Sequence, residues 1–197
     1  GSLFFHFGHY CSAEVPRVLS LLSAKLDNEV TRVATLQALR QMAESPLHLE
    51  MAPILTADSI ISVANFLKQQ SRDTRQASAE LLSSILKTNA AAVASGGPEV
   101  VVPLVKMAST LVVSADLHLA AQSLSLLKMV TTSTPQEHFV SPLIEFLLPR
   151  AVKLASSPFL HGACQEAIVD FLQHLVRLNY PGMGFPELFS ALFTDSM

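Results

Sequence analysis

Arg75-Gln76-Ala77-Ser78 is one of four related tetrapeptides whose spacing decides the fold. The others are Arg32-Val33-Ala34-Thr35, His118-Leu119-Ala120-Ala121 and His161-Gly162-Ala163-Cys164, each 43 residues from the next. In every copy a basic residue or histidine is followed two positions later by alanine and then by another small residue. A period of about 40 to 47 residues is typical of HEAT and armadillo repeats, which carry two main helices each. The sequence therefore predicts an all-α solenoid of HEAT or armadillo type.

Apolar spacing and turn residues divide the chain into four helical hairpins. We expect them at residues 14–45, 56–88, 98–132 and 137–178, with the start of a fifth at residues 183–194. The predicted helix pairs are 14–26 with 28–44, 57–69 with 72–88, 98–111 with 116–131, and 137–155 with 159–178. Pro142 and Pro149 predict an early turn and a kink in the fourth hairpin.

Residues 3–194 form one continuous repeat segment in this interpretation, after a tag remnant at residues 1–2. The chain opens on an apolar stretch at residues 3–7, and its last predicted repeat is incomplete. Solenoids end in polar capping repeats. We therefore expect a segment of a longer solenoid.

The four tetrapeptides also predict packing. Their alanines, called the alanine column, are expected where each second helix crosses its hairpin partner, because a small side chain allows close approach of the backbones. Their first residues, called the basic column, have two interpretations: a stripe facing an acidic partner, or interior groups that bond to carbonyls or a carboxylate. The interior interpretation is favoured, since histidine is mostly neutral at pH 7 and the column lies beside alanines expected to be buried.

Composition narrows the class of protein. The 197 residues carry a net charge of -3, which gives no general attraction to nucleic acid or acidic membranes. The most apolar run, residues 100–113, is interrupted by Pro103 and Lys106 and is too short for a membrane span. Cys11 and Cys164 lie far apart, which suits free thiols in a reducing compartment. We therefore expect a location in the cytoplasm or nucleus.

Candidate partner-binding residues are a short basic cluster at a predicted turn and one member of the basic column. They are Lys68, Arg72, Arg75 and His118. Aromatic residues that could stack on bases do not interleave with this cluster, which speaks against nucleic acid. Exposed turn chemistry is the simpler interpretation of the cluster.

Metal binding and catalysis receive little support. His6, His9 and Cys11 could offer soft ligands, but a structural zinc site needs four and no second cluster is present. Glu166 and Asp170 are four residues apart on one predicted helix, which suits a solvated or partner-facing edge of a packing helix better than an acid pair. No nucleophile elbow or phosphate-binding loop occurs in the sequence. We expect a noncatalytic protein without cofactor or metal.

Several stretches resemble one family, the cullin-associated, neddylation-dissociated proteins. The resemblance runs from about residue 14 to residue 192, through residues 26–32, 38–39, 45–49, 116–119, 157–163, 170–176 and 184–188. Its most specific stretches are Glu44-Ser45-Pro46-Leu47 and Ser157-Pro158-Phe159-Leu160, because a solenoid period alone does not require these turns.

The resemblance implies HEAT repeats from the later half of a large regulator of cullin–RING ubiquitin ligases. Members of the family wrap around an unneddylated cullin and its RING subunit, and they promote exchange of substrate receptors. Competition with the adaptor belongs mainly to the family's C-terminal repeats, so this segment is not expected to exchange receptors by itself. No contact residues carry over, because no short motif here defines the cullin contact.

Other functions stay open at this point. A HEAT adaptor of another kind, such as a transport receptor or a phosphatase scaffold, would share the same repeats. A nucleic-acid-binding solenoid is less favoured because of the low positive charge, and an enzyme is less favoured still. The segment is expected to be monomeric.

Overall fold

The computed structural model describes residue 6, residues 13–46, residue 51, residues 55–181, and residues 184, 186, 187 and 190. The chain divides into two compact units, Gly1–Val100 and Val101–Met197, and each unit is described by itself. Among the described residues the regular structure is entirely helical. The all-α, HEAT-type fold is therefore confirmed. The prediction of one continuous array concerns the placement of the two units and stays a prediction.

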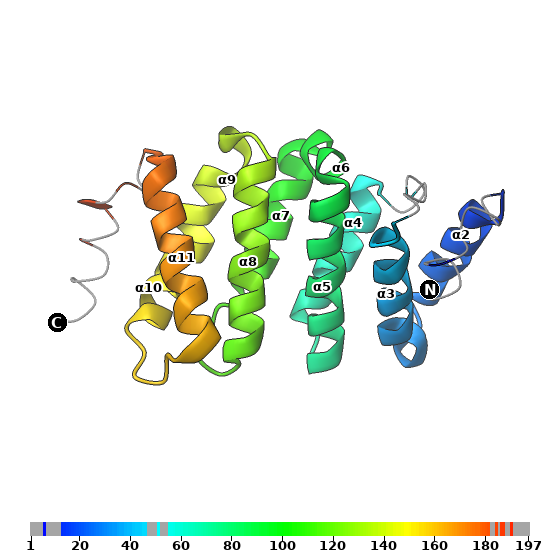
Figure 1. Ribbon diagram of the computed structural model, residues 1–197, viewed down its shortest axis with the longest axis horizontal. Coiled ribbons are helices and arrows are strands. Elements are labelled where there is room, and N and C mark those ends of the chain that lie inside the picture. Colours follow the sequence, from blue (N-terminus) through cyan, green and yellow to red (C-terminus); the bar gives the residue numbers. More distant parts are fainter. Residues whose placement is uncertain are drawn as a thin grey trace. The chain divides into compact units, whose positions relative to one another are not determined.

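The first unit contains two helical hairpins and a short connecting helix. Helices α2 (Val15–Lys25) and α3 (Glu29–Ala43) form the first hairpin. Helix α4 (Ala57–Asn65), the 3₁₀ turn η3 (Phe66–Lys68) and α5 (Arg72–Thr88) form the second, and α6 (Ala90–Ser95) follows. The second helices, α3 and α5, pack along each other. In Figure 1, α5 lies in front of α4.

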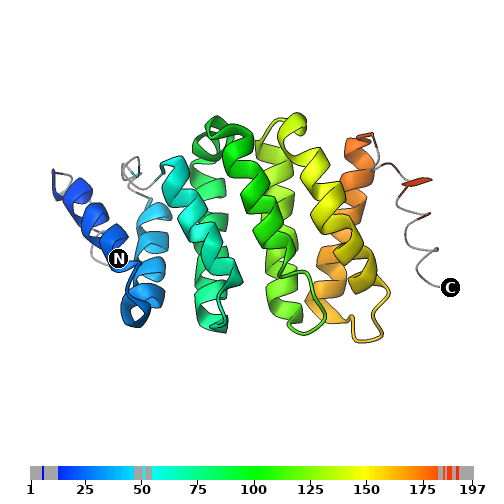
Figure 2. The same cartoon turned by 180° about the vertical axis from the view of Figure 1, so that it is seen from behind.

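The second unit repeats this plan. Helix α7 (Gly97–Ser109), whose first turn precedes the unit boundary, pairs with α8 (Leu117–Ser133). The fourth hairpin contains α9 (Gln136–Pro142), η4 (Leu143–Leu147) and α10 (Leu148–Ala155), followed by α11 (Gly162–Leu178). The second helices α8 and α11 pack along each other, and Figure 2 shows α7, α9 and α10 from the opposite side.

Capping side chains explain where the second helices begin. Helix N-termini leave backbone amides without partners, and short polar side chains accept from them. Asn28 Oδ1 accepts from the Val30 amide at the start of α3, and Ser71 Oγ accepts from Thr74 at the start of α5. Asp116 Oδ1 accepts from the Leu119 amide 3.1 Å away at the start of α8. The predicted boundaries of these helices are correct to within a few residues because these caps are visible in the sequence.

Two boundaries differ from the prediction. Helix α6 was not expected as a separate element, and α11 begins at Gly162 rather than at residue 159. Gly162 has a φ of 57°, a left-handed conformation that glycine adopts without steric cost, so it ends the loop from Ser157 and starts the helix. The predicted fifth repeat at residues 183–194 and the opening at residues 3–7 lie largely outside the described residues.

The fourth hairpin contains a π-helical turn where a kink was predicted. Residues Leu143–Leu147 form this turn, and the Leu148 amide bonds to the Leu143 carbonyl five residues earlier. Pro149 has no amide hydrogen, so the Glu145 carbonyl lacks the usual donor four residues later. Between Pro142 and Pro149 the backbone hydrogen bonds of the helix therefore span five residues instead of four.

The alanine column was predicted only in part. Ala77 and Ala120 are buried, whereas Ala34 and Ala163 are exposed. The centre of the buried stripe lies one residue further along, at Thr35, Ser78 and Cys164. A residue one position from that centre lies at the edge of the stripe, about 100° around the helix, so a small rotation exposes it.

Serine hydroxyls mark the closest approach of paired helices. Ser78 Oγ donates to the Val63 carbonyl, joining α5 to α4, and both atoms are buried. Ser123 Oγ donates to the Ala108 carbonyl over 2.7 Å, joining α8 to α7. Serine therefore contacts the backbone of the partner helix next to Ala77 and near Ala120.

Within the described residues, no helix is both long and apolar enough to cross a lipid bilayer.

Candidate functional site

The basic column does not form a stripe. Arg32 is buried, and its Nε donates to the Leu26 carbonyl over 2.8 Å while its Nη2 donates to the Asp27 carbonyl. These bonds satisfy carbonyls at the end of α2, as the interior interpretation predicts. His118 and His161 are exposed instead. The interior interpretation is therefore confirmed for Arg32 and wrong for the two histidines, because the shorter imidazole bonds within its own segment.

The two histidine contacts are local. His118 Nε2 accepts from the Gln122 amide 3.1 Å away, one turn along α8. His161 Nδ1 donates to the Phe159 carbonyl over 2.8 Å, within the loop before α11.

The predicted basic cluster lies at the junction of η3 and α5. Lys68 and Arg72 are exposed, and Arg75 is half-buried. The Arg75 Nε atom is buried without a hydrogen-bond partner in the described structure. His118 belongs to the other unit, so the structure groups three of the four candidates and leaves their partner-binding role a prediction.

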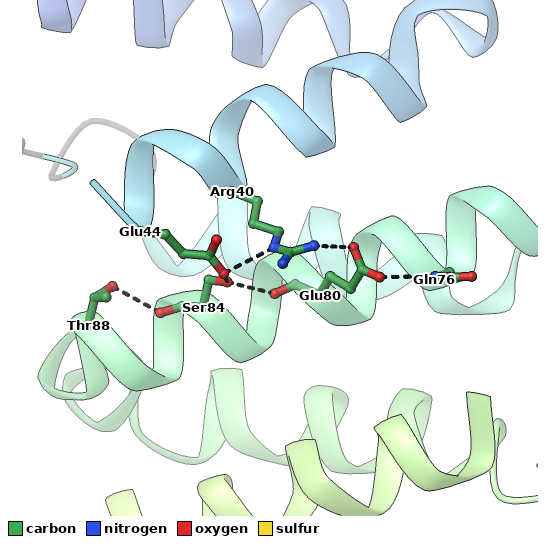
Figure 3. Close-up of polar contacts among 6 residues, drawn as sticks. All are labelled: Arg40, Glu44, Gln76, Glu80, Ser84 and Thr88. Carbon is green, nitrogen blue, oxygen red and sulfur yellow. Dashed lines mark hydrogen bonds and ion pairs between the residues drawn. The ribbon is translucent and has the colours of Figure 1, made fainter. Parts of the chain in front are cut away.

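A polar network joins α3 to α5 in the first unit (Figure 3). Arg40 Nε donates to Glu44 Oε1 over 3.0 Å, and its Nη1 pairs with Glu80 on α5. Ser84 Oγ lies 2.6 Å from the same Glu44 oxygen and also contacts the Glu80 carbonyl. Gln76 Nε2 donates to the other Glu80 oxygen over 3.0 Å. One arginine therefore links two carboxylates on neighbouring repeats.

The electrostatics of this network favour its charged form. The hydrogen bond to Glu44 and the charges of Glu44 and Glu80 raise the pKa of Arg40 against the opposing effect of burial. Burial tends to raise the pKa of Glu44, but hydrogen bonds with Ser84 and Arg40 and the charge of Arg40 outweigh it, and the pKa is lowered. The Arg40 side chain is 38% exposed, so the pairing orients the helices more than it stabilises them.

The second unit has a corresponding pair of contacts between α8 and α11. Lys128 Nζ lies 2.6 Å from Asp170 Oδ2, and Thr131 Oγ1 lies 2.8 Å from His174 Nε2. The hydrogen bond with Lys128 lowers the pKa of Asp170. Asp170, whose side chain is 59% exposed, therefore lies at an exposed edge of α11 and pairs with the neighbouring helix α8.

The sequence reasoning missed these inter-repeat contacts, although a signal for them exists. Arg40 and Glu80 are 40 residues apart, Lys128 and Asp170 are 42 apart, and Thr131 and His174 are 43 apart. Complementary side chains one repeat apart on consecutive second helices would have indicated them.

The side chains that were considered as metal ligands and rejected lie mostly outside the described part of the chain. His9 and Cys11 are among those residues, and His6 is exposed. Among the described residues, no three His, Cys, Asp or Glu side chains gather as a metal site would require. Cys164 carries a buried free thiol, and burial raises its pKa.

Comparison with known proteins identifies the family of this chain. Cullin-associated NEDD8-dissociated protein 2 of Mus musculus is 32% identical over 88% of this chain, and protein 1 of Arabidopsis thaliana is 31% identical over 88%. Protein 1 of Dictyostelium discoideum is 26% identical over the whole chain. The chain belongs to the cullin-associated NEDD8-dissociated family. No family model matches it.

This chain spans only 14% to 16% of the length of those three relatives. The suspected family and the internal position within a longer protein are therefore both confirmed. Which part of the family's solenoid it represents stays a prediction.

The turns at residues 44–46 and 157–160 have distinct structural roles. Glu44 and Ser45 end α3, where Glu44 anchors the network to α5 and Ser45 is buried. Ser157 Oγ accepts from the Phe159 amide in the loop before α11, and the Phe159 side chain is 72% exposed. One stretch therefore joins adjacent repeats, and the other presents an aromatic side chain at a turn.

His174 is expected to make the stability of the chain depend on pH. Burial lowers its pKa, the charges of Lys128 and Arg177 lower it further, and Asp170 opposes them. The unfolded chain therefore binds a proton more readily at this position, so protonation favours unfolding. We expect the free energy of unfolding to fall as the pH falls below about 6.5, the ordinary histidine pKa.

The replacement His174→Gln should make this pH dependence shallower. Urea unfolding at pH 7.5, 6.5 and 5.5, compared between wild type and His174→Gln, measures the difference. His161→Gln is the matched control, because His161 is exposed and bonds only within its loop. Parallel pH profiles for all three proteins would contradict the assignment.

Proposed function

We propose that the chain is a noncatalytic scaffold segment of a regulator that binds unneddylated cullin–RING complexes and promotes exchange of substrate receptors. The observation that carries the proposal is the 31% to 32% identity, over 88% of this chain, to proteins named cullin-associated and NEDD8-dissociated. Repeated helical hairpins suit this role, because they present extended surfaces to other macromolecules. The buried free thiol of Cys164 supports a reducing location, the cytoplasm or nucleus.

The second-helix layer is the surface we assign to the cullin. In the first unit its helices are tied together by the Arg40 network, which fixes their relative position before any partner binds. Lys68 and Arg72 lie exposed at the edge of this layer, beside the start of α5. Preorganised surfaces lose less conformational freedom on binding.

Binding to two forms of one cullin tests the proposal. The chain is immobilised and incubated with a purified cullin–RING complex, either unmodified or conjugated to NEDD8, and the full-length Arabidopsis relative serves as the positive control. We expect retention of the unmodified complex and much weaker retention of the conjugated one. Retention of neither form, or equal retention of both, would count against the proposal.

A charge reversal tests the assigned surface. Lys68→Glu combined with Arg72→Glu should weaken cullin retention if this edge faces the partner. The matched control reverses Arg17 and Lys25, which are exposed on α2. Equal loss of binding in both double variants would indicate general electrostatics instead of a specific contact.

A further inference from the structure

A groove in the second unit lies between the first helix of the fourth hairpin and the turn that follows α7. Its volume is about 530 Å³, and two segments line it. The turn between α7 and α8 contributes Val112, Val113, Ser114 and Ala115, and η4 with α10 contributes Glu145, Phe146, Pro149, Arg150, Lys153 and Leu154. This volume is in the range of sites that hold a small ligand or one or two side chains.

The floor of the groove is apolar and partly open to solvent. Val113 is 37% exposed, although large apolar side chains are mostly buried in this protein. Phe146 belongs to the π-helical turn created by Pro149, and turns of this kind occur frequently at functional sites. The proline therefore shapes the helix at the place where it borders the groove.

Positive charge gathers at the same place. Residues 101–197 contain five lysines and arginines, and three of them surround the groove. Arg150 and Lys153 line it directly, three residues apart on one face of α10. Lys106 Nζ lies 5.0 Å from the centre of the Phe146 ring. Glu145 is the single carboxylate among the lining residues.

Two of these cations, Arg150 and Lys153, are exposed and available to a ligand, whereas Lys106 already lies over the Phe146 ring. Among the described residues, neither Arg150 nor Lys153 has an ion-pair partner, whereas Lys128 in the same unit pairs with Asp170. Like charges placed close together repel each other, and a carboxylate-bearing ligand would relieve that repulsion. The groove therefore complements a ligand that is both acidic and apolar.

We propose that this groove binds a short segment of a protein partner in which a large apolar side chain is flanked by aspartate or glutamate. The apolar side chain packs on Val113 and Phe146. The flanking carboxylates pair with Arg150 and Lys153, and Lys106 adds a third cation at the ring. The site is separate from the cullin surface proposed above and does not depend on it.

Fluorescence polarisation with a defined peptide tests this proposal. The probe is a labelled hexapeptide of sequence Glu-Asp-Leu-Phe-Asp-Glu, titrated with the 197-residue chain. We expect saturable binding that weakens with added salt. Two comparison peptides replace the acids with glutamine and asparagine, or the Leu-Phe pair with two alanines, and both should bind about tenfold or more weakly.

Two single variants place the binding in this groove. Arg150→Glu and, independently, Lys153→Glu should each weaken the peptide about tenfold or more while retaining the helical circular dichroism of wild type. Arg177→Glu is the matched control, because Arg177 is exposed on α11 outside the groove lining and should leave the affinity unchanged.

Three outcomes would overturn the proposal. They are absence of saturable peptide binding by the wild-type chain, equal affinity in the Arg150, Lys153 and Arg177 variants, and stronger binding of polyuridylate or phosphatidylserine vesicles than of the peptide.

Discussion

Replacing Phe171 with alanine is expected to lower the free energy of unfolding by about 3 to 5 kcal/mol. Phe171 lies on α11, the helix that packs against both α8 and α10, and its side chain is 1% exposed. Removing the ring loses the favourable free energy of burying it away from water. It also leaves a cavity that the surrounding helices fill only in part. Calorimetric unfolding of the chain should show a transition at markedly lower temperature.

Phe159→Ala is the matched control for this substitution. Phe159 belongs to the same hairpin and is 72% exposed, so its loss should change stability by no more than about 0.5 kcal/mol. If both alanine variants unfolded at the same temperature, the burial assigned to Phe171 would be wrong. A normal melting temperature for Phe159→Ala together with reduced binding of any partner would indicate that the exposed ring serves recognition.

Enlarging the buried alanines is expected to have the next largest effect. Ala120 is 0% exposed and Ala77 is 4% exposed, and each lies close to a serine that contacts the partner helix backbone. A leucine at either position adds volume where the paired helices approach closely. We expect Ala120→Leu and Ala77→Leu each to lower stability by about 1 to 3 kcal/mol.

Ala34→Leu and Ala163→Leu are the controls from the same column. Both positions are exposed, and leucine is nearly as good a helix former as alanine, so these variants should melt close to wild type. Ala90, on α6, is half-buried and suits this purpose less well. Thermal denaturation followed by circular dichroism distinguishes the pairs, and equal melting temperatures for all four leucine variants would contradict the packing described.

Much of the fold could be predicted because its determinants are local. The 43-residue period, the capping residues Asn28, Ser71 and Asp116, and the apolar spacing of each helix are properties of short segments. Helix α6 was missed because its six residues are too few, and too uniformly small and apolar, to show a helical period. The π-helical turn was missed because a proline predicts a disturbed helix but does not specify how the backbone hydrogen bonds around it rearrange.

The candidate sites were less predictable, since they depend on pairs of residues far apart in the chain. Asp170 was expected at the edge of a packing helix, but nothing near it in the sequence points to its charged partner Lys128, which lies 42 residues earlier. The groove brings the turn after α7 together with Arg150 and Lys153, and no local pattern connects these segments.

The sequence by itself determined the repeat class, the start of the second helices and the family, since period, caps and characteristic turns are read along the chain. Only the tertiary structure decided which residues of the alanine and basic columns are buried and that Arg40 pairs with both Glu44 and Glu80. It also decided that Arg150 and Lys153 lie beside an apolar groove. The physical reason is that, with 3.6 residues per turn, the alanine of each repeat lies about 100° around the helix from the centre of the buried stripe, near the edge of that stripe. A small rotation then decides whether a side chain faces its neighbour or solvent, and that rotation is set by packing between repeats.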